Sequence, residues 1–396
     1  MHSNSSSGSR LCLNSLFSSL PLKALALSTI FLPFHSLNAG KTLQYNTVVN
    51  TNTLTVVAVE SPTTVFKEDQ FLHGFGYDLA RNYAQNLNVK LDFKIVADNA
   101  TALRWVQQGK ANFAMTTAGL STIENKGLMS FSASCGDTAN LQKNGLNPEL
   151  SWVFKQADDP LTQTASGFVC QSKQNGVTQQ LASFYNRNVV KPEAWSTIQR
   201  DLSTRLPIYK ASFKQSAAKY DLDWHLLAAI GYQESYLKPE SVSPTGVRGL
   251  MMLTNSTARA MGVSNRSDPA QSIQGGAKYY DLMLTEFDNI PFPDRNWYAL
   301  VAYNMGPGAV SQIQKRLQSQ GKDPNKWVNL YDYLQSNKTR NGRYKQAVQY
   351  VTRIRAYLEH IKTAQTRINI YFLFLKVDKF IVCTNKKLTS LGKLFI

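Results

Sequence analysis

The stretch that decides the fold is Asp221-Leu-Asp-Trp-His-Leu-Leu-Ala-Ala-Ile-Gly-Tyr-Gln-Glu-Ser-Tyr-Leu237. Its apolar residues recur at helical spacing, with Leu227 and Ile230 three positions apart and Glu234 four positions further on. We therefore predict a helix over this stretch, with an apolar face that leads directly to a carboxylate. Burial of Glu234 at that face would raise its pKa, because desolvation disfavours the charged form of an acid.

The same helix is also compatible with a purely structural role. Asp221 can cap its N-terminus and Asp223 suits its first turn, so both acids have a local explanation. Glu234 could equally point to solvent or pair with Lys238. The helix alone leaves these alternatives open.

Three glycine-containing stretches follow this helix. Ser243-Pro-Thr-Gly-Val-Arg-Gly-Leu-Met-Met-Leu253 has two glycines in a turn before an apolar run, where Gly permits close backbone approaches. Asp268-Pro-Ala-Gln-Ser-Ile-Gln-Gly-Gly-Ala-Lys278 reads as a helix entry with glycines for close packing. Leu300-Val-Ala-Tyr-Asn-Met-Gly-Pro-Gly308 places Tyr303 and Asn304, two residue types that often contact sugars, at a helix end. Each stretch taken alone could be plain structure.

In this order and spacing, these motifs resemble the soluble-lytic-transglycosylase domain. The resemblance covers about residues 206–361 and is carried by Glu234-Ser235, Gly249-Leu-Met251 and Ala302-Tyr-Asn304. It implies an all-α, lysozyme-like domain that cuts the β-1,4 bond between N-acetylmuramic acid and N-acetylglucosamine and leaves a 1,6-anhydro sugar. It also implies that no metal or organic cofactor takes part. By resemblance, Glu234 acts as acid and then as base, and the residues that shape the sugar cleft are Ser235, Met251, Tyr303, Asn304 and Tyr350.

Two positions depart from the pattern of this domain. Met252 follows Gly-Leu-Met where many relatives have Gln, and Gln346 stands where relatives often have Glu. The other carboxylates within reach in the sequence, for which we expect structural roles, are Glu240, Asp268 and Asp281. Two other functions stay open: a hydrolytic lysozyme of goose type, and a solute-binding or sensor protein with an inactive enzyme domain.

The chain in front of this domain predicts an α/β fold. Strand-like runs at Leu54–Val59, Val89–Val96 and Ala111–Thr117 alternate with helical patterns at Gly74–Leu87 and Ala100–Gly109, which is typical of a parallel sheet. This order resembles the first lobe of periplasmic solute-binding proteins of the amino-acid type. Only about fifty residues separate Cys135 from Asn186, which is too few for most of a second lobe. We therefore expect no solute cleft of the usual kind.

Charge and composition limit the partners of the chain. The formal net charge is +17 over 396 residues, which favours polyanions, but no nucleic-acid-binding motif accompanies it. We expect peptidoglycan glycan strands as the partner, and export to the periplasm with peripheral attachment to the inner face of the outer membrane. A Cys135–Cys170 disulfide and free thiols are both open. The expected divisions are a signal peptide (1–39), the truncated α/β domain (40–191), a connector (192–209), the helical domain (210–362) and a basic, apolar tail (363–396).

Overall fold

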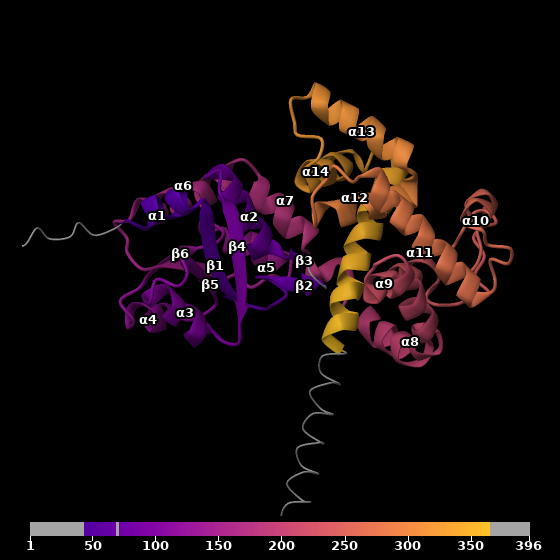
Figure 1. Cartoon of the computed structure of the whole chain (residues 1–396), viewed down its shortest axis with the longest axis horizontal. Helices are drawn as coiled ribbons and strands as arrows, with labels where there is room; N and C mark the ends of the chain where they lie inside the picture. Colours follow the sequence, from indigo (N-terminus) through magenta and orange to yellow (C-terminus); the bar gives the residue numbers. More distant parts are fainter. Residues whose placement is uncertain (1–42, 69–70, 365–396) are drawn as a thin grey trace, which may run out of the picture. The chain divides into compact units, whose positions relative to one another are not determined.

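The computed structural model describes residues 43–68 and 71–364 (Figure 1). The predicted signal peptide and nearly all of the predicted basic tail lie outside these residues. A sheet-containing region comes first in the chain and a helical region follows it, and both belong to one compact unit. Within the described residues, no helix is long and apolar enough to cross a bilayer.

The first region is built on a five-stranded sheet of order β4-β1-β5-β7-β6. The interior strand β1 (Thr53–Val59) pairs in parallel with β4 (Lys90–Val96) and β5 (Phe113–Thr116), which confirms the predicted parallel α/β unit. Its Val-rich sequence suits a strand that is covered on both faces. The sequence did not predict that β6 (Met129–Ser132) and β7 (Ser151–Phe154) would extend this sheet in antiparallel fashion.

Helices cover the sheet, and a small ribbon lies beside it. Only the short helix α5 separates β6 from β7, so the described residues contain one α/β lobe and no second one, as predicted. The remaining elements of this region are α1 (Gln44–Thr51), the antiparallel ribbon β2 (Phe66–Glu68) and β3 (Phe71–His73), α2 (Phe75–Asn86), α3 (Asn99–Gln107), α4 (Leu120–Glu124), α5 (Thr138–Lys143), α6 (Pro160–Gln174), α7 (Val177–Phe184) and the 3-10 helix η1 (Arg187–Val189).

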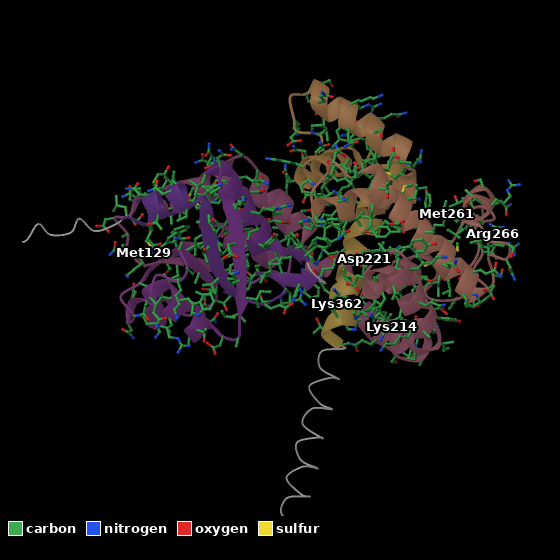
Figure 2. The ribbon with its side chains drawn as sticks, in the orientation of Figure 1. Met129, Lys214, Asp221, Met261, Arg266 and Lys362 are labelled. Atoms are coloured by element: carbon green, nitrogen blue, oxygen red, sulfur yellow. A yellow bond between two sulfur atoms is a disulfide. The ribbon has the colours of Figure 1, made fainter. Side chains whose placement is uncertain are left out.

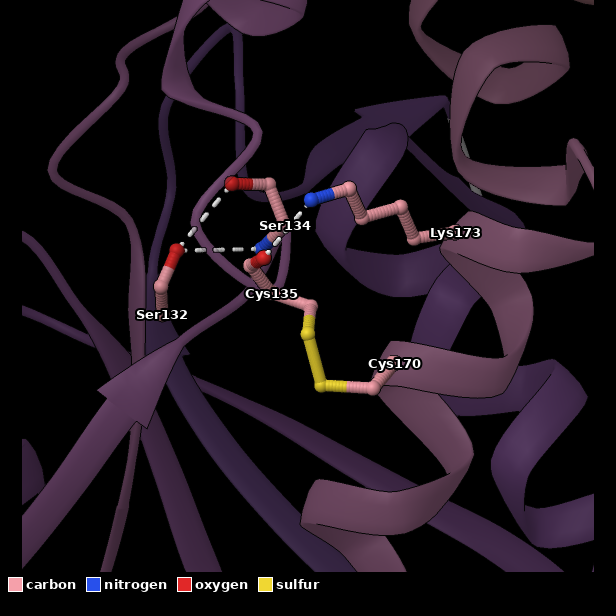
Figure 3. The surroundings of a disulfide bond; sticks show 5 residues. All are labelled: Ser132, Ser134, Cys135, Cys170 and Lys173. Carbon is pink, nitrogen blue, oxygen red and sulfur yellow. Dashed lines mark hydrogen bonds between the residues drawn. A yellow bond between two sulfur atoms is a disulfide. The ribbon is translucent and has the colours of Figure 1, made fainter.

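A disulfide bond cross-links two elements of the α/β lobe. Cys135, just after β6, is bonded to Cys170 on α6, and the Lys173 ammonium donates a hydrogen bond to the Cys135 carbonyl at 3.2 Å (Figure 3). The sequence left this bridge open. A cross-link over 35 positions stabilises a fold by about 3–4 kcal/mol in the chain-entropy description.

The second region is entirely helical, which confirms the predicted all-α domain. Its elements are α8 (Ala194–Lys219), α9 (Trp224–Ser235), α10 (Asn255–Met261), α11 (Pro269–Glu286), α12 (Asp294–Met305), α13 (Pro307–Ser319), α14 (Trp327–Asn337) and a last helix over residues 342–364.

The predicted connector at residues 192–209 is wrong, because α8 begins at Ala194 and continues through Pro207. Proline lacks the N–H that would donate to the carbonyl one turn earlier, so its presence argued against a helix. Packing on both sides of the proline outweighs this cost: Ile198 and Leu202 are buried before it, and Phe213 is buried after it. The helical region therefore starts at Ala194 and not at Lys210, as the pattern indicated.

A buried ionic network ties the two regions together. The Arg81 guanidinium on α2 donates to Asp294 Oδ1 at the start of α12 at 2.7 Å and lies 3.1 Å from Asp78 Oδ1. The Tyr185 hydroxyl donates to Asp78 Oδ2 at 2.6 Å, and Asp294 Oδ2 accepts from the backbone N–H of Trp327 at 2.9 Å. Each carboxylate thus has a partner in place of the water it has lost.

Candidate active site

The site is built around α9, whose N-cap lies two positions later than the sequence predicted. Asp223, not Asp221, is the N-cap, and its carboxylate accepts from the backbone N–H of His225 at 2.9 Å. Asp221 has a left-handed backbone (φ 52°) and lies outside the helix. Leu227 and Ile230 are fully buried, so the predicted apolar face is confirmed.

Glu234 occupies the last turn of α9, where this buried face ends. Its carboxyl is only partly exposed, and the Tyr350 hydroxyl of the last helix donates to its Oε1 at 2.5 Å. Burial raises the pKa of Glu234 to about 7, and the hydrogen bond from Tyr350 opposes this rise because it favours the ionised form. A carboxyl poised near neutral pH can donate a proton and take one back.

Tyrosine rings surround this carboxyl. The Tyr303 and Tyr350 rings lie nearly parallel with centroids 6.5 Å apart, and the Tyr279 ring is tilted against Tyr303 with centroids 5.0 Å apart. Burial raises the pKa of both Tyr303 and Tyr350 well above the usual value, and the nearby Glu234 charge adds to this effect. Both phenols therefore stay protonated and act as hydrogen-bond donors. Tyr279 was not singled out from the sequence, because an isolated Tyr in a helix carries no local signal.

The glycine turn before α10 packs against the end of α9. Gly249 has a φ of +86°, and a Cβ there would lie 1.9 Å from the Arg266 carbonyl oxygen, so this position admits only glycine. Ser235 is buried, and its Oγ lies 2.9 Å from the Leu250 carbonyl and 3.1 Å from the Gly231 carbonyl. The serine therefore joins the helix to the turn, which is a positioning role rather than a direct contact with a ligand.

Met251 links this turn to two other elements. Its side chain is fully buried against Gly276 of α11, where a Cβ would come within 2.6 Å of it. Its backbone N–H donates to the Ser272 hydroxyl at 3.1 Å, and its carbonyl accepts from the Tyr303 hydroxyl at 3.1 Å. The predicted glycines for close packing thus have a defined purpose, since they let α11 approach the turn that holds Tyr303.

Asn304 follows Tyr303 at the end of α12, and its side chain is exposed. Glu234, Tyr350, Tyr303 and Met251 are therefore connected through successive contacts, and Ser235 bonds to Leu250, the neighbour of Met251. Asn304 lies exposed in the last turn of α12.

The other acids singled out from the sequence are Glu240, Asp268 and Asp281. Glu240 is exposed in the loop after α9, and Asp268 caps α11 by accepting from the Gln271 N–H at 2.8 Å. Asp281 lies within α11. Among the residues that the structure describes, no neighbouring acid contributes to the raised pKa of Glu234, and no group of His, Cys, Asp or Glu side chains could hold a metal ion.

The last helix also holds the opposite end of α9. Lys362, labelled on the last helix in Figure 2, has its Nζ 2.5 Å from Asp223 Oδ2. The His225 ring lies 2.7 Å from Asp223 Oδ1. Burial alone would raise the pKa of Asp223, but the contacts with His225 and Lys362 lower it to about 2. This clamp was missed in the sequence because its partners are more than a hundred positions apart.

Comparison with known proteins agrees with this geometry. Residues 211–326 match the family model of the transglycosylase SLT domain. Membrane-bound lytic murein transglycosylase F of Stutzerimonas stutzeri (strain A1501) is 43% identical over 228 residues, which cover 54% of this chain and 47% of that protein. The chain is similar to lytic murein transglycosylases. The resemblance read from the sequence motifs is thereby confirmed.

The chain spans about half the length of the curated relatives it matches. Among solved structures, the match to an ancestral cationic amino acid solute-binding protein covers 36% of this chain and 99% of that protein's chain, with a TM-score of 0.29 at 14% identity. The match to the 70 kDa soluble lytic transglycosylase of Escherichia coli covers 52% of this chain and 36% of that enzyme's chain, with a TM-score of 0.30 at 19% identity. Both scores are low, and the fold described above stands on the elements of this chain.

The two departures from the motif of lytic transglycosylases fall at positions that are not buried. Gln346 is exposed on the last helix, one turn before Tyr350, and Met252 is only partly buried. Tyr350, which matches the pattern, makes the contact with Glu234.

Proposed function

We propose that this protein is a peptidoglycan lytic transglycosylase that cleaves the β-1,4 bond between N-acetylmuramic acid and N-acetylglucosamine. The observation that supports this most is the single carboxyl of Glu234, with a pKa raised to about 7 and a hydrogen bond from Tyr350. A retaining or inverting hydrolase requires a second carboxylate beside the first. The similarity to lytic murein transglycosylases supports chemistry by one residue.

In this mechanism, Glu234 first donates its proton to the glycosidic oxygen as the bond to the anomeric carbon breaks. The N-acetyl group of the muramic acid shields the positive charge that develops there. The Glu234 carboxylate then takes the proton of the C6 hydroxyl, whose oxygen bonds to the anomeric carbon and closes a 1,6-anhydro ring. The nucleophile belongs to the substrate, so water is not consumed. The Tyr350 hydroxyl would stabilise the ionised carboxylate of Glu234 between the two steps.

Roles for the surrounding residues follow from their positions. Tyr303, Tyr350 and the exposed Asn304 would contact the glycan, while Ser235 and Met251 would keep the glycine turn in place against α9. We also propose export to the periplasm and peripheral attachment to the inner face of the outer membrane. The signal-like N-terminal pattern and the description of the relatives as membrane-bound support this location.

The experiment is a zymogram on a cell-wall gel with wild type beside Glu234→Gln, followed by mass spectrometry of digested sacculi. Loss of clearing in the variant and a product lighter by one water than the hydrolysis product are expected. A reducing-end product would favour a goose-type lysozyme instead. Absence of clearing by folded wild type would favour a solute-binding or sensor protein.

A further inference from the structure

A large cavity lined by described residues lies away from Glu234. Its volume is about 1150 Å³, and none of the residues proposed for glycan cleavage lines it. Small-molecule sites have volumes of roughly 300–1,000 Å³, so the space is sufficient for an organic ligand.

The two walls of this cavity come from different regions of the chain. Phe66 of β2 and Arg187 of η1 line it from the α/β region, whereas Trp195, Leu202 and Lys210 line it from α8. The last helix closes one side. Among the described residues the α/β region has no second lobe, and α8 lines the cavity together with the α/β region.

Apolar side chains form one part of the cavity lining, beside polar and charged ones. Phe66 and Leu202 are buried, Trp195 is half-buried, and Leu206 and Ile361 add aliphatic surface. Such a surface stabilises a hydrocarbon chain by about 0.8 kcal/mol for each buried methylene group.

The charged groups of the lining have an excess of positive charge. Arg187 and Lys210 come from the two facing walls. Glu359 is the one carboxylate among the described lining residues, and its Oε1 lies 2.5 Å from the fully buried Arg355 guanidinium, which neutralises it. Lys210 also lies 5.2 Å above the Trp224 ring, which places its ammonium beside apolar surface. An anionic group therefore finds two cations, whereas a cationic group finds only repulsion.

We propose that this cavity binds a single-chain anionic amphiphile, of which a fatty acid is the simplest example. The hydrocarbon chain lies against Trp195, Leu202 and Leu206, and the acidic group lies at Arg187 or Lys210. Binding here is separate from glycan cleavage.

The test is calorimetric titration of the full chain with laurate and, as a matched ligand, with dodecyltrimethylammonium, both below their micelle concentrations. The two ligands share a twelve-carbon chain and differ in the sign of their charge. One saturable site with at least tenfold tighter binding of laurate is expected. Equal affinities, or no binding of laurate to folded protein, would overturn the proposal.

Two variants locate the site. Ser203 is exposed on α8 and lines the cavity, so Ser203→Trp fills the space and should weaken laurate at least tenfold. Thr204→Trp, at the next exposed position and outside the lining, is the matched control and should bind as wild type does. Lys210→Glu should also weaken laurate. Unchanged binding in both Ser203→Trp and Lys210→Glu, with intact circular dichroism, would place laurate elsewhere and refute the assignment. No readout depends on glycan cleavage, so this result and that of the zymogram are independent.

Discussion

Replacing Glu234 by Gln should stabilise the protein at alkaline pH while abolishing activity. Burial raises the pKa of this acid from 4.5 to about 7. Between these values the folded chain binds more protons at Glu234 than the unfolded chain, so its contribution to stability falls as the pH rises and is lowest above pH 7. The full shift corresponds to about 3.4 kcal/mol at about 1.36 kcal/mol per unit. Because the side chain is partly exposed, we expect about 1–3 kcal/mol.

Gln keeps the shape and an acceptor for the Tyr350 hydroxyl but does not ionise. The difference in unfolding free energy between Glu234→Gln and wild type should therefore be near zero at pH 4.5 and reach its full value at pH 8. Urea unfolding followed by circular dichroism at a series of pH values measures it. Glu240→Gln, at an exposed position, is the control and should show no such trend. A difference for Glu234→Gln that is the same at pH 4.5 and pH 8 would refute the desolvation argument.

Three further outcomes follow from single contacts. Tyr350→Phe removes the donor that favours ionised Glu234, so the alkaline limb of the pH–rate profile should move to higher pH; a move to lower pH contradicts the assignment. Gly249→Ala should cost more than about 3 kcal/mol in urea unfolding because of the facing carbonyl, whereas Gly246→Ala, also at positive φ but in open space, should cost about 1 kcal/mol. Lys362→Met should cost about 2–3 kcal/mol by leaving the buried N-cap carboxylate of α9 without its cation, and Lys362→Arg should recover most of it; equal losses would argue against an ionic role.

Local patterns predicted the parts of the fold that local forces determine. The β-branched run of β1 (Thr53–Val59), the alternation in β4 (Lys90–Val96) and the apolar face of α9 were visible because burial selects residue types and spacing within each element. The role of Gly249 could also be anticipated, since only a close approach or a positive φ requires glycine. Pro207 misled the prediction because its cost is local while the packing that outweighs it is not.

Contacts between distant positions could not be predicted from these patterns. Tyr350 and Glu234 are 116 positions apart, and the sequence offered Tyr350 only through the family resemblance. The Arg81–Asp294 pair spans 213 positions and carries no motif. The cavity between α8 and the α/β region exists only after both have folded, so no single segment indicates it.

The two contacts between α9 and the last helix together fix the position of the Glu234 carboxyl. Tyr350 meets Glu234 and Lys362 meets Asp223, so the helices run antiparallel. At about 1.5 Å per residue, Tyr350 and Lys362 lie about 18 Å apart along the last helix, and Glu234 and Asp223 lie about 16–17 Å apart along α9. Because these lengths match, both contacts form in one register, and a slip by one turn of about 5.4 Å would break both. The ion pair at the N-terminus of α9 therefore helps to hold Glu234 against Tyr350 at its other end, although neither Lys362 nor Asp223 touches the site.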